Sequence, residues 1–175
     1  MKNINSPILH PDLELINEHI FKGCGLQITN LVTEPESKEY AAHHFQLNGL
    51  NVVYREAKIT PTKTGQFVTI WKRNKEGITT PFDISDDNDL YLIAAKKDTH
   101  SGIFIFPKAV LYHHKILSGT DSAGKRGTRL YASWDLVTSK QAQKTKDWQV
   151  DHFLEFTSNQ FDLNKAKELL AIKIQ

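Results

Sequence analysis

Five strand-like segments in the middle of the chain constrain its fold more than any other feature. Each is rich in β-branched and aromatic residues, and turn-forming residues or polar loops separate them. The segments predicted as strands are Leu50–Ile59, Gln66–Arg73, Asp89–Ala95, Gly102–Pro107 and Thr128–Trp134. Helical patterns are confined to the two ends of the chain, so a sheet is expected to form the centre of the fold.

Two helices are predicted before the strands. Residues 11–22 place apolar side chains near helical spacing, and glycines follow as a stop signal. A capping Thr33, followed by a proline and a glutamate, predicts a second helix over about residues 33–47. Asn48–Gly49 is expected to end that helix or to make a tight turn.

Two more helices are predicted after the strands. Ser139 can cap a helix that carries Gln149, Phe153 and Phe156 on one face, and Asp162 can start a last helix, Leu163–Ile172. Helices, then strands, then helices again predict an α/β (α+β) fold with a mixed central β-sheet flanked by helices. We expect a single domain over residues 1–175, because no repeat, low-complexity tract or long linker divides the chain.

The composition is that of a globular protein. Hydrophobic residues make up 39% and charged residues 24% of the 175 positions. No apolar run approaches the roughly 20 residues that span a bilayer, so no membrane insertion is expected. The first residues show no apolar core with a cleavage site, and Cys24 is a single cysteine. These features predict a cytoplasmic location.

Basic residues are concentrated in two segments, although the formal net charge is only +2. Six basic residues and one acid lie between Arg55 and Lys75, and five basic residues oppose one acid between Lys108 and Arg129. A near-neutral total can therefore hide a basic face.

Aromatic residues accompany these cations. Trp71 alternates with Lys72 along one predicted strand, and Arg129 shares a strand face with Tyr131 on another. Lys125 and Arg126 lie in a glycine-bounded loop, where backbone amides and cations can approach a phosphate. Arginine forks fit phosphate oxygens, and aromatic rings can stack on unpaired bases. Nucleic acid is therefore the expected partner, although each residue taken alone can equally well belong to the core or to a solvated strand end.

Two incomplete carboxylate–lysine patterns suggest a metal-dependent nuclease as an alternative. Such an enzyme needs two carboxylates near one Mg²⁺ and a lysine near the attacking water. Glu56 and Lys58 have the acid-x-Lys spacing, but their second acid would have to come from Glu36 or Glu39. Asp89 and Lys108 offer the other version. Mg²⁺ is expected only if this alternative holds, and no other cofactor is predicted.

No other constellation predicts a metal or nucleotide site. His43–His44 and His113–His114 are adjacent pairs whose side chains diverge, so neither pair is expected to chelate one ion. No phosphate-binding loop or dinucleotide fingerprint occurs. We therefore expect no metal site.

Long stretches of the chain resemble the MepB-like family of small bacterial proteins. The family is named for a companion of a multidrug efflux pump and its repressor. The segments that carry the resemblance, over roughly residues 35–155, are REAKITPTKTGQFVTIWKRN, PFDISDDNDLYLI, GIFIFPKAVL, GKRGTRLYASWD and QAQKTKDWQVDHF. The resemblance implies a restriction-endonuclease-like core with a degenerate metal site. Phe106 agrees with this, since it stands where an acid would be needed.

The resemblance also highlights individual residues. Those with an implied binding role are Arg55, Lys63, Gln66, Trp71, Arg73, Lys125, Arg126, Arg129, Tyr131, Trp134, Gln141 and Gln149; Lys58, Asp89, Lys108 and Trp148 are highlighted too. The chemistry of the basic segments had already selected most of the binding residues. Asp89, Gln141 and Gln149 are added mainly by the resemblance.

Together these observations predict a protein that binds DNA or RNA mainly through backbone contacts and does not cleave efficiently. The catalytic alternative, a Mg²⁺-dependent endonuclease, would use Glu56 and Lys58 or Asp89 and Lys108. A second alternative is a regulatory module that binds a protein or a small anion through the same face. A homodimer is compatible with this fold class, but no residue demonstrates one.

Overall fold

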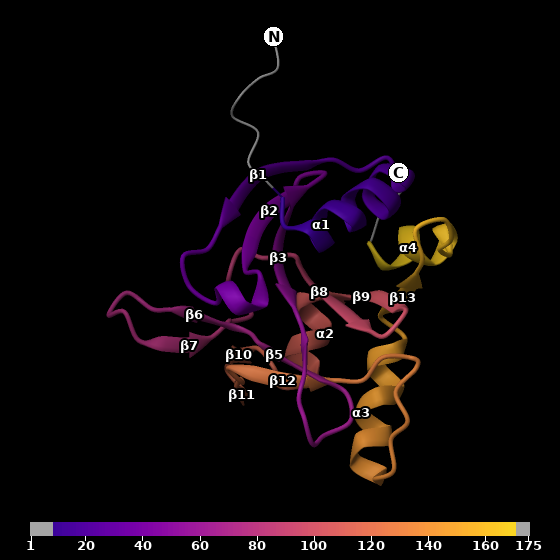
Figure 1. Cartoon of the computed structure of the whole chain (residues 1–175). Helices are drawn as coiled ribbons and strands as arrows, with labels where there is room; N and C mark the ends of the chain where they lie inside the picture. The colour runs from indigo at the N-terminus through magenta and orange to yellow at the C-terminus, as the bar shows by residue number, and fades with distance from the viewer. Residues whose placement is uncertain (1–8, 171–175) are drawn as a thin grey trace.

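A computed structural model describes residues 9–170 (Figure 1). Its centre is a six-stranded mixed sheet in the order β1-β2-β3-β8-β9-β13. Only the neighbours β3 and β8 run parallel in this sheet. The strands are β1 Ile28–Thr33, β2 His43–Leu47, β3 Leu50–Glu56, β8 Leu90–Lys97, β9 His100–Pro107 and β13 Phe153–Phe156.

Smaller strand groups and four α-helices surround this sheet. A three-stranded sheet has the order β12-β5-β4. Two hairpins complete the strands: β6–β7 follows β5 in the chain, and β10–β11 follows α2. These strands are β4 Lys58–Ile59, β5 Gln66–Thr69, β6 Trp71–Arg73, β7 Thr79–Pro81, β10 Ser118–Gly119, β11 Ser122–Ala123 and β12 Gly127–Leu130. The helices are α1 Pro11–Ile16, which continues in tighter and wider turns to Cys24, α2 Lys108–His113, α3 Lys140–Val150 and α4 Leu163–Leu169.

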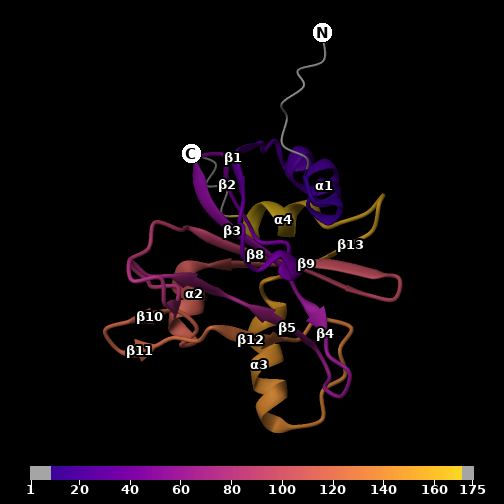
Figure 2. The same cartoon turned by 60° about the vertical axis from the view of Figure 1, so that its left-hand side comes forward.

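The large sheet separates two hydrophobic cores. Both views place α1 and α4 on one side of it and α2, α3 and the small sheets on the other (Figures 1 and 2). Strand alternation supplies both cores, because successive side chains point to opposite faces. On β3, Val52 and Tyr54 join the core under α1, while Val53 joins the core under β5 and α2.

Every predicted strand segment contains strand structure, and the mixed sheet confirms the predicted α+β fold class. The caps of the last two helices are also confirmed. Ser139 Oγ accepts a hydrogen bond from Ala142 N at 3.1 Å, and Asp162 Oδ1 accepts one from Lys165 N at 2.9 Å. Among the described residues, no helix has the length and apolar character needed to cross a membrane.

The predicted helix over residues 33–47 is wrong. This stretch contains the end of β1, a short 3-10 turn at Lys38–Tyr40 and the whole of β2. The capping pattern at Thr33 was a local signal, whereas His43–Leu47 alternates between buried and half-buried side chains and pairs with strands on both sides. Asn48 and Gly49 adopt positive φ angles of 50° and 83°. They form the tight turn that was predicted as the alternative to a helix end.

Phe153 and Phe156 were predicted on the face of a helix, and this prediction is also wrong. Helix α3 ends at Val150, and the two phenylalanines belong to β13. Phe153 is the register partner of Phe104 on β9. A three-residue spacing of aromatic side chains suits a helix. Here, however, a turn lies before Phe153, and β13 forms an edge strand of the large sheet.

Candidate functional site

Acids neutralise the cations near the end of the first basic segment. Lys72 forms an ion pair with Asp86, and Arg73 Nε lies 2.6 Å from Glu36 Oε1. The Arg73 guanidinium also lies over the Trp71 ring, 5.5 Å from its centroid. Cations that are already paired in this way contribute little to a long-range attraction for a polyanion.

Arg55, in the same segment, is a core residue with 1% of its side chain exposed. Its Nη1 donates to Tyr54 O at 2.8 Å, and its Nη2 lies 3.1 Å from Glu34 Oε2. The other oxygen of Glu34 contacts His44 Nε2. Burial alone would raise the pKa of Glu34, but hydrogen bonds and charge from His44 and Arg55 leave it below its ordinary value. In this conformation the Arg55 guanidinium faces protein, and it offers no surface contact.

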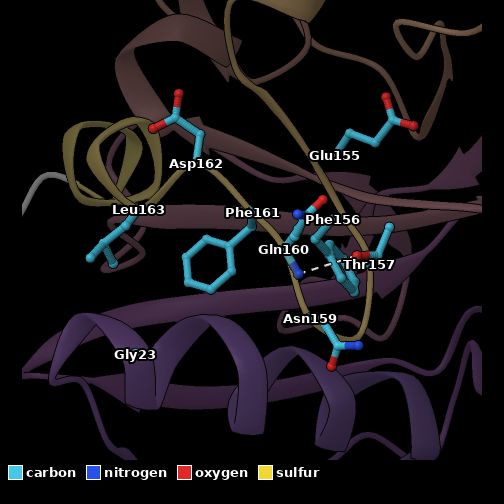
Figure 3. Close-up of a pocket in the computed structure, with 9 residues that line it drawn as sticks. All are labelled: Gly23, Glu155, Phe156, Thr157, Asn159, Gln160, Phe161, Asp162 and Leu163. Atoms are coloured by element: carbon cyan, nitrogen blue, oxygen red, sulfur yellow. Dashed lines mark hydrogen bonds between the residues drawn. The ribbon is translucent and has the colours of Figure 1, made fainter.

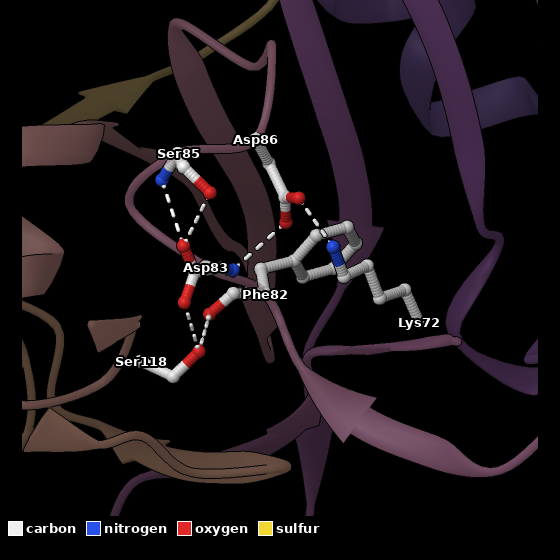
Figure 4. A network of polar contacts seen from close by, with 6 residues as sticks. All are labelled: Lys72, Phe82, Asp83, Ser85, Asp86 and Ser118. Carbon is white, nitrogen blue, oxygen red and sulfur yellow. Dashed lines mark hydrogen bonds and ion pairs between the residues drawn. The ribbon is translucent and has the colours of Figure 1, made fainter. Parts of the chain in front are cut away.

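The acidic turn before β8 also contacts the first basic segment (Figure 4). Asp83 accepts hydrogen bonds from the Ser85 hydroxyl and amide at 2.6 and 2.9 Å, and from the Ser118 hydroxyl at 2.7 Å. Asp86, the partner of Lys72, accepts a hydrogen bond from Asp83 N at 2.8 Å. These carboxylates therefore organise a turn and hold Lys72.

In the second basic segment Lys115 pairs with Asp121 at 2.9 Å, but three other cations have no such partner. Lys125, Arg126 and Arg129 form no ion pair with any carboxylate among residues 9–170. Arg126 Nε donates to Thr79 O at 3.0 Å, and Arg129 Nη1 donates to Thr64 O at 3.2 Å. These two bonds orient the arginines without neutralising them. Lys63, in the turn between β4 and β5, is likewise exposed.

A groove of about 680 Å³ lies between the end of α2, β12 and α3. Two of its lining residues, Lys125 and Lys144, are exposed lysines without an ion-pair partner in the described chain. The other lining residues are His114, Ile116, Thr128, Gln141, Thr145, Asp147, Trp148 and Asp151. The groove thus brings Lys125 and Gln141, two residues predicted from separate segments, to one place.

An aromatic pair forms one wall of this groove. The His114 and Trp148 rings stack with 3.8 Å between centroids and 9° between planes. Trp148 also packs against Phe106, 5.5 Å away. Burial, together with the charges of His113 and His152, lowers the pKa of His114, which favours the neutral ring. The wall is therefore a flat aromatic surface beside two cations, a combination that suits stacking on nucleobases.

Three further residues with a predicted binding role make structural contacts instead. Gln149 is fully buried, with Oε1 accepting from Tyr131 N at 2.7 Å and Nε2 donating to Arg129 O at 3.0 Å. Gln66 is buried and donates to Lys96 O at 2.8 Å. Trp134 packs between Phe153 and His100. Gln149 thereby fixes β12 on α3 and sets the position of Arg129.

Asp89 and Lys108 meet at one end of the large sheet. Lys108 N donates to Asp89 O at 3.2 Å, since their strands pair at Leu90 and Pro107. The Asp89 carboxylate, however, accepts a hydrogen bond from Asn51 N at 2.8 Å, and it belongs to no group of three metal-binding side chains among residues 9–170. The side chain of Phe106 is buried in the core, where an acid would be required for metal binding.

Glu56 and Lys58 lie at the opposite end of the sheet. The parallel register pairs Val52 with Leu90 and Glu56 with Ala94, which separates Glu56 from Asp89 by roughly 16 Å at about 3.3 Å per residue. The expected partners Glu36 and Glu39 are not its neighbours; instead, His10 Nδ1 lies 3.0 Å from Glu56 Oε1. Burial raises the pKa of Glu56 to about 7. The two carboxylate–lysine patterns therefore cannot combine around one ion in this structure.

Comparison with known proteins agrees with this architecture. The family model described as MepB-like matches residues 34–155, which is well over half of the chain. The chain belongs to the MepB-like family. A crystal structure of MepB is 28% identical in sequence, with a TM-score of 0.73, and the similarity covers 85% of this chain and 98% of that one. No curated protein matches the chain.

The MepB-like region includes both basic segments and the whole groove. Within it, sequence reasoning missed Lys144, although Lys140 and Lys144 share a face of α3 at a four-residue spacing. It also missed Glu34 as the partner of Arg55, because no local pattern joins residues so far apart. His10 and Asp12 precede the MepB-like region and were not singled out.

A second hollow, of about 810 Å³, lies against the loop between β13 and α4 (Figure 3). It faces Gly23 and is lined by that loop, including the carboxylates Glu155 and Asp162. None of its lining residues is a lysine or arginine. This hollow of the MepB-like chain therefore lacks the positive charge needed to hold a phosphate.

Proposed function

We propose that this MepB-like chain binds DNA or RNA through the groove between α2, β12 and α3. The observation that carries the proposal is the pairing state of the cations. In the first segment Arg55 is buried and Lys72 and Arg73 are paired with acids, whereas Lys125 and Lys144 line the groove and, like Arg126 and Arg129, have no carboxylate partner among residues 9–170. Unpaired cations around a concave surface focus the field that attracts a phosphate backbone.

The chemistry of the groove favours backbone contacts over base reading. Lysines act as point charges toward phosphates, and arginines can bind phosphate oxygens with their planar fork. The hydroxyl groups of Thr128 and Thr145 and the amide of Gln141 add polar contacts along the same wall. The aromatic pair His114–Trp148 adds a stacking surface that accepts any base.

The proposal is limited to binding. Cleavage would need two carboxylates near one metal ion together with a lysine. Glu56 and Asp89 lie at opposite ends of their strands, and neither end lies in the groove. The carboxylates that do line the groove, Asp147 and Asp151, are four positions apart at the end of α3, and they belong to no convergent set of three metal-binding side chains among residues 9–170.

The decisive experiment is an anisotropy titration with labelled single- and double-stranded DNA and RNA over a range of salt concentrations. Five neutralised phosphates on a duplex would give a slope of log affinity against log salt of about −4 to −5. The variant Lys125→Ala/Lys144→Ala should flatten this slope by about 2 on duplex, because each lost contact removes about 0.9. It should weaken binding to every sequence by a similar factor.

Lys72→Ala/Arg73→Ala is a matched control that removes the same number of positive charges. Its cations are already paired with Asp86 and Glu36, so affinity should change little. An equal loss in both double variants would show that only net charge matters and would contradict the groove as the site. Absence of binding to all four nucleic acids would reject the proposal and favour a protein-binding module.

A further inference from the structure

Three side chains with metal-binding atoms meet where α1 begins. They are His10, just before the helix, Asp12 in its first turn, and Glu56 at the end of β3. One ligand atom from each lies within 4.8 Å of the other two. All three side chains are partly buried, and Asp12 and Glu56 are only 20% and 16% exposed. The cluster joins segments that are more than 40 positions apart in the sequence.

We propose that His10, Asp12 and Glu56 bind a divalent metal ion of borderline softness, such as Zn²⁺. Zn²⁺ accepts both imidazole nitrogen and carboxylate oxygen as ligands, and three protein ligands leave a fourth position open. Mg²⁺ and Ca²⁺ prefer oxygen ligands throughout, so the histidine selects against them.

The distances leave room for such an ion after small side-chain movements. Zn–N and Zn–O bonds of about 2.0–2.2 Å place tetrahedral ligand atoms about 3.4 Å apart. The pair His10 Nδ1–Glu56 Oε1, at 3.0 Å, must open slightly, and the remaining ligand atoms lie within 4.8 Å. Although His10 Nδ1 is close to Glu56, it is buried and makes no hydrogen bond of normal geometry with any of residues 9–170. It is therefore free to donate its lone pair to an ion.

Several neighbouring groups bear on the charge of the site. Lys96 on β8 pairs with Asp12, Lys58 acts on Glu56 through its charge, and the Tyr54 hydroxyl lies 3.5 Å from Glu56 Oε1. His43 on β2 acts on His10 through its charge. Lys96 is half exposed, so its ammonium group can move into solvent when an ion takes its place beside Asp12. Lys96 therefore competes with the ion and lowers its affinity.

The site is independent of the proposed nucleic-acid groove. Tyr54 and Glu56 are two residues apart on β3 and point to the sheet face that α1 covers, while the groove lies on the other face. His10 also lines a hollow of about 300 Å³ together with Glu34 and His43, so small molecules such as water can reach the imidazole. Residues 10 and 12 precede the MepB-like match.

The test uses the whole chain after treatment with a chelator, titrated calorimetrically with ZnCl₂, CoCl₂ and MgCl₂. We expect one Zn²⁺ per chain, a rise in thermal midpoint with Zn²⁺ but not with Mg²⁺, and the visible absorption bands of four-coordinate Co²⁺. His10→Ala and Glu56→Gln should each weaken Zn²⁺ binding by at least about tenfold. His113→Ala/His114→Ala, which removes two adjacent histidines at the end of α2, should leave Zn²⁺ affinity unchanged.

Lys96→Ala distinguishes a metal site from a cluster of ion pairs. It leaves the three proposed ligands in place, so its result holds even if the ligand variants fail to fold. Removal of the competing ammonium group should tighten Zn²⁺ binding several-fold. An affinity that is unchanged or weaker in Lys96→Ala would overturn the proposal. So would the absence of stoichiometric binding, or binding that is lost in His113→Ala/His114→Ala and retained in His10→Ala.

Discussion

The guanidinium of Arg55, on the interior strand β3, is buried, and Glu34 is the only carboxylate that pairs with it among residues 9–170. Their Nη2–Oε2 distance is 3.1 Å, and Glu34 comes from the segment that follows β1. Glu36, two positions after Glu34, forms a second Arg–Glu pair with Arg73, and this pair is exposed to solvent. The chain therefore contains a buried and an exposed version of the same interaction.

Glu34→Ala should destabilise the protein by about 3–5 kcal/mol, because removal of one partner leaves a buried charge uncompensated. The measurement is the free energy of unfolding from urea denaturation. Glu36→Ala is the matched control and should cost at most about 1 kcal/mol, since solvent screens its pair. Equal losses in the two variants would contradict the assignment of Arg55 to the interior.

The lowered pKa of Asp83 predicts how the free energy of unfolding changes at acid pH. Hydrogen bonds from the Ser85 hydroxyl and amide and from Ser118 lower the pKa of Asp83 from 3.8 to about 2. A carboxyl group whose pKa is depressed by folding stabilises the protein above its unfolded value, and this contribution is lost as the pH falls from about 4 through about 2. Asp83→Ala should cost about 1–3 kcal/mol at pH 7 and less at pH 2.

The check is the difference in unfolding free energy between Asp83→Ala and the parent at several pH values. Asp87→Ala serves as the control, because it removes an exposed neighbouring carboxylate that makes no hydrogen bond with residues 9–170. A destabilisation by Asp83→Ala that stays constant down to pH 2 would argue against a depressed pKa.

Two glutamines on α3, both highlighted by the family resemblance, should behave differently. Gln149→Ala breaks hydrogen bonds to buried backbone groups of Tyr131 and Arg129 and should lower stability by about 1–3 kcal/mol. Gln141 is exposed in the groove, so Gln141→Ala should change stability by no more than about 0.5 kcal/mol. Under the proposed function, it should instead weaken nucleic-acid binding.

Thermal denaturation and anisotropy titration of both variants separate the two roles. If Gln141→Ala were the destabilising change and Gln149→Ala the neutral one, the placement of α3 on β12 would be wrong. Gln143 is the third glutamine of the same helix; it is exposed and does not line the groove, so Gln143→Ala should affect neither quantity.

Periodicity along the chain predicted much of the fold, because it reports local burial. The strand segments and both C-terminal helix caps followed from residues that interact with near neighbours. Residues 33–47 failed because a cap-like pattern at Thr33 outweighed the alternation of His43–Leu47, whose strand state depends on pairing with β1 and β3. The finer prediction of a restriction-endonuclease-like core stays a prediction.

Burial of polar residues was harder to predict than strands. Arg55, Gln66 and Gln149 have side chains that are usually exposed, and the sequence around them gives no sign of their partners. Those partners, Glu34, Lys96 O and the backbone of β12, come from distant segments. Lys125 and Gln141, named from separate segments of the sequence, line one groove, and their binding role stays a prediction.

Gly102 on β9 gives the last prediction, because the Phe153 ring lies directly against it. A Cβ atom at position 102 would lie 2.0 Å from Phe153 Cζ, a distance that no packing arrangement tolerates. Phe153 cannot move away freely, since it packs on Phe104 and Trp134 in the same core. Gly102→Ala should therefore destabilise the protein by about 1–3 kcal/mol through overpacking, as measured by chemical denaturation. Gly102→Ala/Phe153→Leu should recover part of the loss, and a double variant whose losses merely add would contradict the steric explanation.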